Sequence, residues 1–120
     1  MPTKMKGNNM GACYEVDLVI KTRKERELIE NVNKYVAESN LRFYDNIPIN
    51  SIDDIAKKFL AAHQRMFDIY DTHSYSASFD ATYSWEGILA ELWDIMEPYL
   101  ESGSYIDVWP DRGHWAESVE

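Results

Sequence analysis

The residues whose types suit metal binding or catalysis are few, and none stands in an established motif. Asp68, Asp71 and His73 lie close together in the chain, and grouped carboxylate and imidazole side chains can bind a metal ion. Their spacing matches no known ligand motif, and polar residues gather at helix ends in any case. We therefore predict no metal site and no bound cofactor.

Two other reactive side chains favour structural roles. His63 falls at the centre of the apolar face of a helix predicted over 51–70, the position of a core histidine bonded to a carbonyl or a tyrosine hydroxyl. Cys13 opens a predicted strand and has no basic neighbour or helix N-terminus to activate it as a nucleophile. A small-molecule binder or enzyme that uses His63 or His73 stays open as a further alternative.

Paired carboxylates offer acid–base chemistry, and Glu86 with Asp94 or Glu97 with Glu101 are spaced to form such pairs. General acid catalysis requires that one carboxyl group be desolvated, and a solvent-facing stripe does not desolvate it. The chain also lacks the glycine-rich nucleotide loop, the zinc-protease helix, the paired-cysteine motif and the nucleophile elbow. The sequence gives an enzyme no support.

Residues 84–103 must position those carboxylates, and they predict an amphipathic helix. Ser84 is its expected N-cap, Pro98 should kink or end it, and Gly103 suits its C-terminal turn. One face is apolar: Trp85, Ile88, Leu89, Leu92, Trp93, Ile95, Met96, Tyr99 and Leu100. The other face is acidic and contains no Lys or Arg: Glu86, Glu91, Asp94, Glu97 and Glu101.

The acidic excess extends over the whole second half of the chain. The net charge is −9, and residues 67–120 contain twelve Asp and Glu residues but one basic residue, Arg112. Direct binding to nucleic acid is disfavoured, because it needs cations that displace counterions from the phosphates. A basic partner is the natural complement.

The remaining periodicities predict one α+β domain over 13–120, after a flexible lead-in at 1–12. Apolar and polar residues alternate over 13–21, 74–83, 105–109 and 114–119, which indicates strands. Helices are predicted over 23–39 and 51–70, with capping boxes at Thr22 to Glu25 and at Ser51 to Asp54. Residues 41–44 are an optional strand. The order β-α-(β)-α-β-α-β-β predicts three helices on one face of a mostly antiparallel sheet of four or five strands.

Targeting and membrane signals are absent from the sequence. No run approaches the roughly 18 apolar residues of a membrane span, and the N-terminus has no apolar region of a signal peptide. The lone Cys13 excludes an internal disulfide. We expect a reducing, cytoplasmic location and no membrane partner.

All four tryptophans lie in the last 36 residues, at positions 85, 93, 109 and 115. Trp85 and Trp93 suit the core. Trp109 and Trp115 flank the hairpin turn Pro110 to Gly113 and should make a cross-strand pair. Alternatively, one of them is an exposed anchor for a partner.

Two function classes follow from these patterns. The first is an acidic interaction module without catalysis, which as a nucleic-acid mimic would occupy a basic groove, as phage and mobile-element inhibitors of restriction and CRISPR systems do. The second is a homo-oligomer, such as a homodimer, or a scaffold that pairs through a sheet edge or the hairpin. The expected partner-binding residues are Glu86, Glu91, Asp94, Glu97, Glu101, Asp107, Asp111, Trp109 and Trp115.

Overall fold

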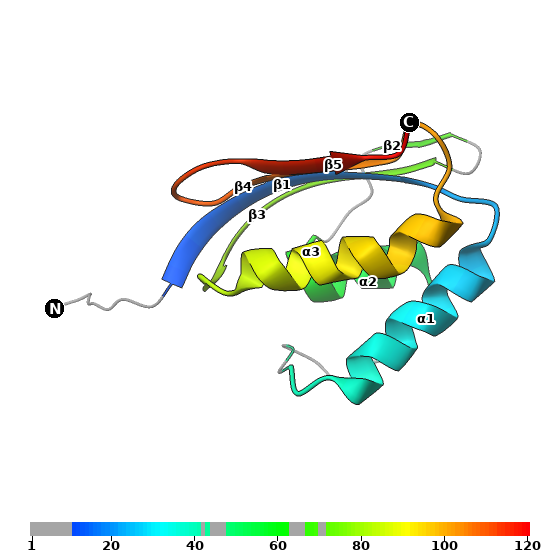
Figure 1. Ribbon diagram of the computed structural model, residues 1–120, viewed down its shortest axis with the longest axis horizontal. Helices are drawn as coiled ribbons and strands as arrows, with labels where there is room; N and C mark the ends of the chain where they lie inside the picture. Colours follow the sequence, from blue (N-terminus) through cyan, green and yellow to red (C-terminus); the bar gives the residue numbers. More distant parts are fainter. Residues whose placement is uncertain (1–10, 42, 44–47, 63–66, 70–71) are drawn as a thin grey trace, which may run out of the picture.

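Residues 11–41, 43, 48–62, 67–69 and 72–120, which the computed structural model describes, form an α+β sandwich of two layers (Figure 1). Helices cover one face of an antiparallel sheet, so the predicted fold class is confirmed. In chain order the elements are β1 (Gly11–Lys21), α1 (Glu25–Glu38), α2 (Ile52–Leu60), β2 (Phe67–Ile69), β3 (Thr72–Thr82), α3 (Trp85–Met96), the 3₁₀ turn η1 (Glu97–Tyr99), β4 (Tyr105–Trp109) and β5 (Trp115–Ser118).

β1 is the central strand of the sheet, whose order is β2-β3-β1-β4-β5. It pairs with β3 over its full length, from Gly11 opposite Thr82 to Lys21 opposite Thr72, and with β4 on its other side. Its alternating sequence directs every second side chain toward the helices. The predicted inward residues of β1 are all buried: Tyr14, Val16, Leu18 and Ile20.

The core lies between the sheet and the three helices. Burial of each large apolar side chain contributes about 1.5–3 kcal/mol relative to an exposed position. α3 lies next to α1 and packs its apolar stripe on the sheet, as its periodicity predicts. The fully buried helical residues include Leu28, Val32, Ile52, Ile55, Phe59, Leu60, Leu89, Leu92, Trp93 and Met96.

Only one of the predicted helix starts has a side-chain cap. The Ser51 hydroxyl accepts a hydrogen bond from the Asp54 N–H at 3.2 Å, as expected. The capping box at Thr22 is wrong, because α1 begins after Lys24 and the Thr22 hydroxyl donates to the Tyr99 carbonyl at 2.6 Å. Ser84 precedes α3 as predicted, but its side chain makes no cap bond.

The second helix is shorter than predicted. α2 ends at Leu60 rather than near Tyr70, and Phe67 belongs to β2, at one edge of the sheet. Ala61 takes a left-handed conformation with φ 54°, and the Ala62 N–H bonds to the Ala56 carbonyl at 3.3 Å. The Ala61 N–H bonds to the same carbonyl, so α2 ends in a left-handed turn.

The optional strand at 41–44 is not present among the described residues of that segment, since Leu41 and Phe43 lie outside any strand. The connection to α2 is held instead by the Asn33 side chain. Its amide donates to the Ile49 carbonyl at 2.7 Å and accepts from the Ile49 N–H at 3.2 Å. The side-chain amide of Asn33 thus bonds both backbone groups of Ile49, as a residue of a neighbouring strand would do in a sheet.

In the C-terminal part of the chain, the effects predicted for Pro98 and Gly113 are observed, whereas that for Gly103 is not. α3 ends at Met96 and continues as η1, which contains Pro98, as the missing proline N–H requires. Gly113 has φ 83° in the β4–β5 turn. Gly103 also has a positive φ, 98°, but it lies in the turn before β4 and not at the end of α3, which corrects the prediction.

Two further predictions concern the N-terminal lead-in and membrane-spanning helices. Residues 1–10 of the predicted lead-in lie outside the described residues, and Gly11 and Ala12 belong to β1. In the described part of the chain, no helix combines the length and apolar character needed to cross a bilayer.

Candidate interaction surface

The sheet has one face on which no described helix lies, and we call it the open face (Figure 1). The open face is formed by the residues of each strand that alternate with the buried ones. Their side chains on the three central strands are mainly acidic, hydroxyl-bearing or aromatic, with one basic residue, Lys21, at the end of β1: Gly11, Cys13, Glu15, Asp17, Val19, Lys21, Thr72, Ser74, Ser76, Ser78, Asp80, Thr82, Tyr105, Asp107 and Trp109.

β4 places an acid between two aromatic side chains on the open face. Tyr105, Asp107 and Trp109 alternate with the buried Ile106 and Val108. Tyr105 is 38% exposed and Trp109 is 39% exposed, so both rings offer accessible apolar surface. Aromatic residues at this exposure are the typical anchors of protein interfaces.

Carboxylates from neighbouring strands meet beside these rings. Asp17 on β1 lies directly opposite Asp107 on β4, and Glu15 lies opposite Trp109. Like charges at directly opposed positions destabilise a sheet. The Ser76 hydroxyl donates to Asp17 Oδ1 at 2.7 Å, which offsets part of this repulsion. The arrangement is therefore a concentrated acidic patch that the fold tolerates at a cost in stability.

His114 holds Trp109 in position. The imidazole stacks on the indole with ring centroids 4.7 Å apart and planes 13° from parallel. Its Nε2 atom lies 3.2 Å from Asp107 Oδ1. The contact joins the hairpin turn to the open face and restricts the rotamer of Trp109. A shallow cleft of about 250 Å³ lies next to this ring, between Glu15, Asp17, Ser76 and Ser78.

The predicted partner-binding residues divide between the two layers. Asp107 and Trp109 lie on the open face. Asp94 and Glu97 are exposed on the helical layer, and Glu86 is half-buried there. The structure therefore does not bring the predicted residues together into one continuous surface.

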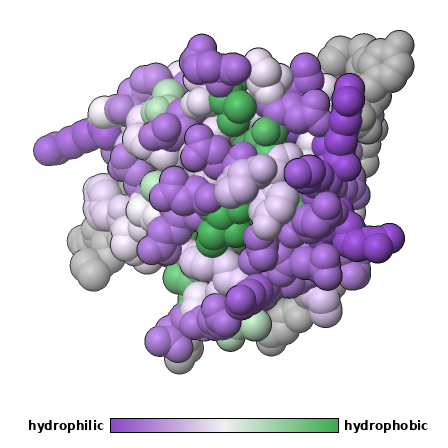
Figure 2. Space-filling view, turned by 45° about the vertical axis from the view of Figure 1, so that its right-hand side comes forward, coloured by the Kyte–Doolittle hydropathy of each residue, from purple (hydrophilic) through white to green (hydrophobic). Residues whose placement is uncertain are grey.

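Two acids of the helical layer have partners on or near α1. The Tyr35 hydroxyl donates to Glu91 Oε1 at 2.6 Å. Glu101, which follows η1, lies 3.6 Å from the Arg23 guanidinium. The face in Figure 2 has mixed hydrophilic side chains around a small central hydrophobic area. The acidic stripe of α3 is thus partly compensated, by a hydroxyl group at Glu91 and by a guanidinium group near Glu101.

The hairpin turn uses its acid locally. Asp111 is exposed and its Oδ1 atom accepts a hydrogen bond from the Cys13 N–H at 3.1 Å. This bond ties the turn to the first residues of β1. Asp111, one of the predicted partner-binding residues, therefore has a structural role in the fold.

The predicted pairing of Trp109 with Trp115 is wrong. Trp115 lies opposite Val108 and packs against the core, whereas Trp109 lies on the open face. Because Trp115 pairs with Val108, it takes the same face of the sheet as Val108, and Trp109, the next residue of β4, takes the other face. The alternative expectation, that one tryptophan is exposed as an anchor, fits Trp109.

The other reactive residues form no site in the described part of the chain. His73 Nε2 lies 3.8 Å from Glu25 Oε1, and no three His, Cys, Asp or Glu side chains gather there in a way that could hold a metal ion. Cys13 is exposed at the edge of the open face. His63 and Asp71 lie outside the described residues.

Comparisons with protein-family models, with curated proteins and with solved structures found no match to this chain.

Sequence reasoning missed Glu15 and Asp17 as members of the acidic patch. Their alternation on predicted strands already placed them on the polar side. The missing information was the strand order. Asp17 lies beside Asp107 only because β1 and β4 are neighbours in the sheet. Strand order depends on long-range contacts that local periodicity does not record.

Proposed function

We propose that this protein is a non-catalytic interaction module that binds a cationic partner protein through its open face. The observation that carries the proposal is the row Tyr105, Asp107 and Trp109 on β4, with Asp17 and Glu15 beside it on β1. Exposed aromatic rings next to carboxylates suit arginine, whose guanidinium stacks on aromatic faces and binds carboxylates in a bidentate manner.

The location of the like charges supports a role in binding rather than in folding. A carboxylate pair at opposed positions of an exposed sheet lowers stability, and residues that favour function at the expense of stability are a recurrent feature of binding sites. Solubility alone is served by acids dispersed over the surface. The open face instead gathers three of them around an exposed tryptophan.

The finer form of the proposal is mimicry of a nucleic acid. Residues two apart on a strand, such as Glu15 and Asp17, are separated by about 6.6–6.8 Å, and Asp107 lies opposite Asp17, so the sheet holds three negative charges at fixed positions. The partner would be a nucleic-acid-binding groove rich in Lys and Arg, as in a restriction or CRISPR effector that a phage or mobile element inhibits. The lone Cys13 is consistent with an encounter in a reducing cytoplasm.

The test compares two charge reversals of equal size on opposite layers. Tagged protein captures partners from a lysate at low salt, and the captured partner is then identified and purified. We expect Glu15→Lys with Asp17→Lys to abolish its binding, and Asp94→Lys with Glu97→Lys to leave its affinity within about threefold. Raising the salt should weaken the wild-type complex, because exposed charge pairs are screened.

The two variants carry the same net charge, so bulk electrostatics cannot separate them. Equal loss of binding in both variants would show a non-specific charge effect and would refute the assignment to the open face. Loss in the α3 variant alone would move the site to the helical layer. Circular dichroism of each variant checks that the fold is retained.

The homo-oligomer remains the alternative proposal, and the geometry favours it less. Two open faces would bring their acidic patches together. The described edge strand β5 has four residues and carries Glu117, and charged residues on short edges oppose strand pairing between chains. Sedimentation from micromolar to tens of micromolar protein distinguishes the two, since the proposed module should stay monomeric.

A further inference from the structure

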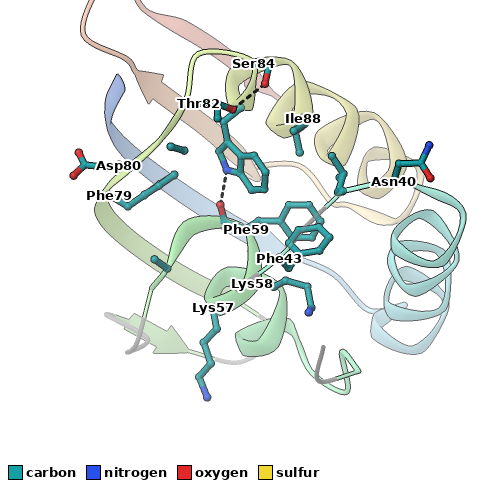
Figure 3. Close-up of a pocket in the computed structure, with 14 residues that line it drawn as sticks. Asn40, Phe43, Lys57, Lys58, Phe59, Phe79, Asp80, Thr82, Ser84 and Ile88 are labelled. Atoms are coloured by element: carbon teal, nitrogen blue, oxygen red, sulfur yellow. Dashed lines mark hydrogen bonds between the residues drawn. The ribbon is translucent and has the colours of Figure 1, made fainter. Parts of the chain in front are cut away.

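A cavity of about 840 Å³ opens on the opposite side of the sheet from the acidic patch (Figure 3). It lies between α2, the first turns of α3, the end of β3 and the described residues Asn40, Leu41 and Phe43. This volume is within the range of about 300–1,000 Å³ that is usual for small-molecule sites. The cavity shares no side chain with the row on β4 that carries the proposed function.

Aromatic rings from separate segments form its walls. Phe43 meets Phe59 edge to face with ring centroids 5.0 Å apart, and Trp85 lies 6.0 Å from Phe43 and 6.3 Å from Phe59. Phe79 lines the side formed by β3, where it stacks on the buried Tyr14 at 5.6 Å. These flat apolar surfaces suit a planar or cyclic apolar molecule.

Polar atoms in the walls already bond to each other. The Trp85 indole N–H donates to the Phe59 carbonyl at 2.9 Å. The hydroxyl groups of Thr82 and Ser84 are 2.8 Å apart and share a hydrogen bond. Because these groups are satisfied, a ligand gains little by offering them polar atoms, and the body of the ligand should be apolar.

Charge at the rim selects the polar end of the ligand. Lys57 and Lys58 lie in the last turn of α2, and Lys58 Nζ is 4.9 Å from the centroid of the Phe43 ring. The acid of the lining, Asp80, is directed away from the rings in Figure 3, because its position on β3 alternates with those of Phe79 and Ala81. Lys58 is therefore the cation beside the rings, and Lys57, whose side chain points away from the rings in Figure 3, can approach the rim only by rotation of its flexible stem.

We propose that this cavity binds an aromatic or cyclic apolar small molecule with one carboxylate or sulfonate group. The rings of Phe43, Phe59, Phe79 and Trp85 enclose its body, and Lys57 and Lys58 neutralise its anionic group. The site is independent of the interaction proposed for the open face.

The test uses two fluorescent probes that differ by one charge. 1-Anilinonaphthalene-8-sulfonate carries a sulfonate, and N-phenyl-1-naphthylamine is its neutral counterpart. We expect the folded protein to bind one equivalent of either probe, and the sulfonate more tightly. Reversal of both rim lysines, Lys57→Glu with Lys58→Glu, should weaken the sulfonate about tenfold and leave the neutral probe within twofold.

Matched variants separate the cavity from the rest of the surface. Reversal of an exposed lysine on α1, Lys34→Glu, should change neither affinity. Ala81→Leu and, independently, Ile88→Phe place side-chain volume in the cavity and should abolish binding of both probes. Near-ultraviolet circular dichroism confirms native packing of each variant, since loosely packed states also bind such dyes.

If a natively packed Ala81→Leu or Ile88→Phe variant binds both probes as the wild type does, the proposed binding site is wrong. Equal weakening of the two probes by the lysine reversals would overturn the preference for an anion. Failure of this experiment leaves the open-face proposal untouched, because the two surfaces lie on opposite sides of the sheet.

Discussion

At the scale of single residues, the tyrosine hydroxyl groups make hydrogen bonds between separate helices and strands. The Tyr14 hydroxyl donates to the Thr82 carbonyl at 2.8 Å from the centre of the sheet. Tyr35 on α1 donates to Glu91 on α3, and Tyr75 bonds to Asp53 on α2. Each phenol joins segments far apart in sequence, so its protonated form belongs to the native packing.

Tyr35 should make stability fall at high pH. Burial, together with the hydrogen bond to Glu91 and the charge of that carboxylate, raises the pKa of Tyr35 above its ordinary value. A group with a raised native pKa contributes stability that is present below the ordinary pKa of about 10 and is lost as the pH rises above it. The Tyr35→Phe variant should lose free energy of unfolding less steeply over this alkaline range than the wild type.

Urea denaturation between pH 8 and pH 11 measures this difference. Burial raises the pKa of Tyr14 as well, so some alkaline dependence should persist in the variant. Parallel curves for the two proteins above pH 10 would contradict the role given to Tyr35.

The opposed carboxylates of the open face should cost stability. Replacing Asp17 by Asn removes the repulsion from Asp107 and keeps an acceptor for the Ser76 hydroxyl. We expect the Asp17→Asn variant to gain about 0.2–1 kcal/mol in free energy of unfolding at low salt. The gain should shrink as salt is added, and a loss of stability at low salt would refute the like-charge interpretation.

At the scale of elements, hydrophobic periodicity predicted what local physics determines. The alternation of β1 and β3, the apolar face of α3 and the turn at Gly113 are all as predicted, because each depends on residues close in sequence. The end of α2 differs from the prediction, since Ala61 and Ala62 are good helix formers, and the strand at Phe67–Ile69 depends on its pairing with β3.

The same division explains the candidate surface. Asp107 and the possibility of an exposed anchor at Trp109 were predicted from alternation within one strand. The opposition of Asp17 to Asp107 depends on β1 and β4 being neighbours, although 90 residues separate the two positions in the chain. The facing of Trp115 toward the core depends on the register of a turn. Neither is recorded in a local pattern.

The helix starts give a direct comparison of two serines. Ser51 caps α2 through the Asp54 N–H, whereas Ser84 stands before α3 without a cap bond. Ser51→Ala should therefore cost about 1 kcal/mol in free energy of unfolding, and Ser84→Ala should cost much less. Chemical denaturation of the two variants under one condition measures the difference, and equal costs would show that the cap geometry has no energetic consequence.

At the scale of the whole molecule, the two faces of the sheet have different chemistry. The open face combines carboxylates with Tyr105 and Trp109. The face covered by helices holds the core and, at one end, the cavity with its two rim lysines. Our two proposals assign a cationic macromolecule to one side and an anionic small molecule to the other.

The central claim is that a cationic partner contacts the open face, and site-specific photocrosslinking tests it most directly. p-Benzoyl-phenylalanine is placed at Ser78, on β3 beside Glu15, or at Asp94 on the exposed side of α3. Each protein is irradiated with the captured partner at low salt, and crosslinked products are identified by mass spectrometry. We predict a crosslink from position 78 and none from position 94; a crosslink from position 94 alone would contradict the account.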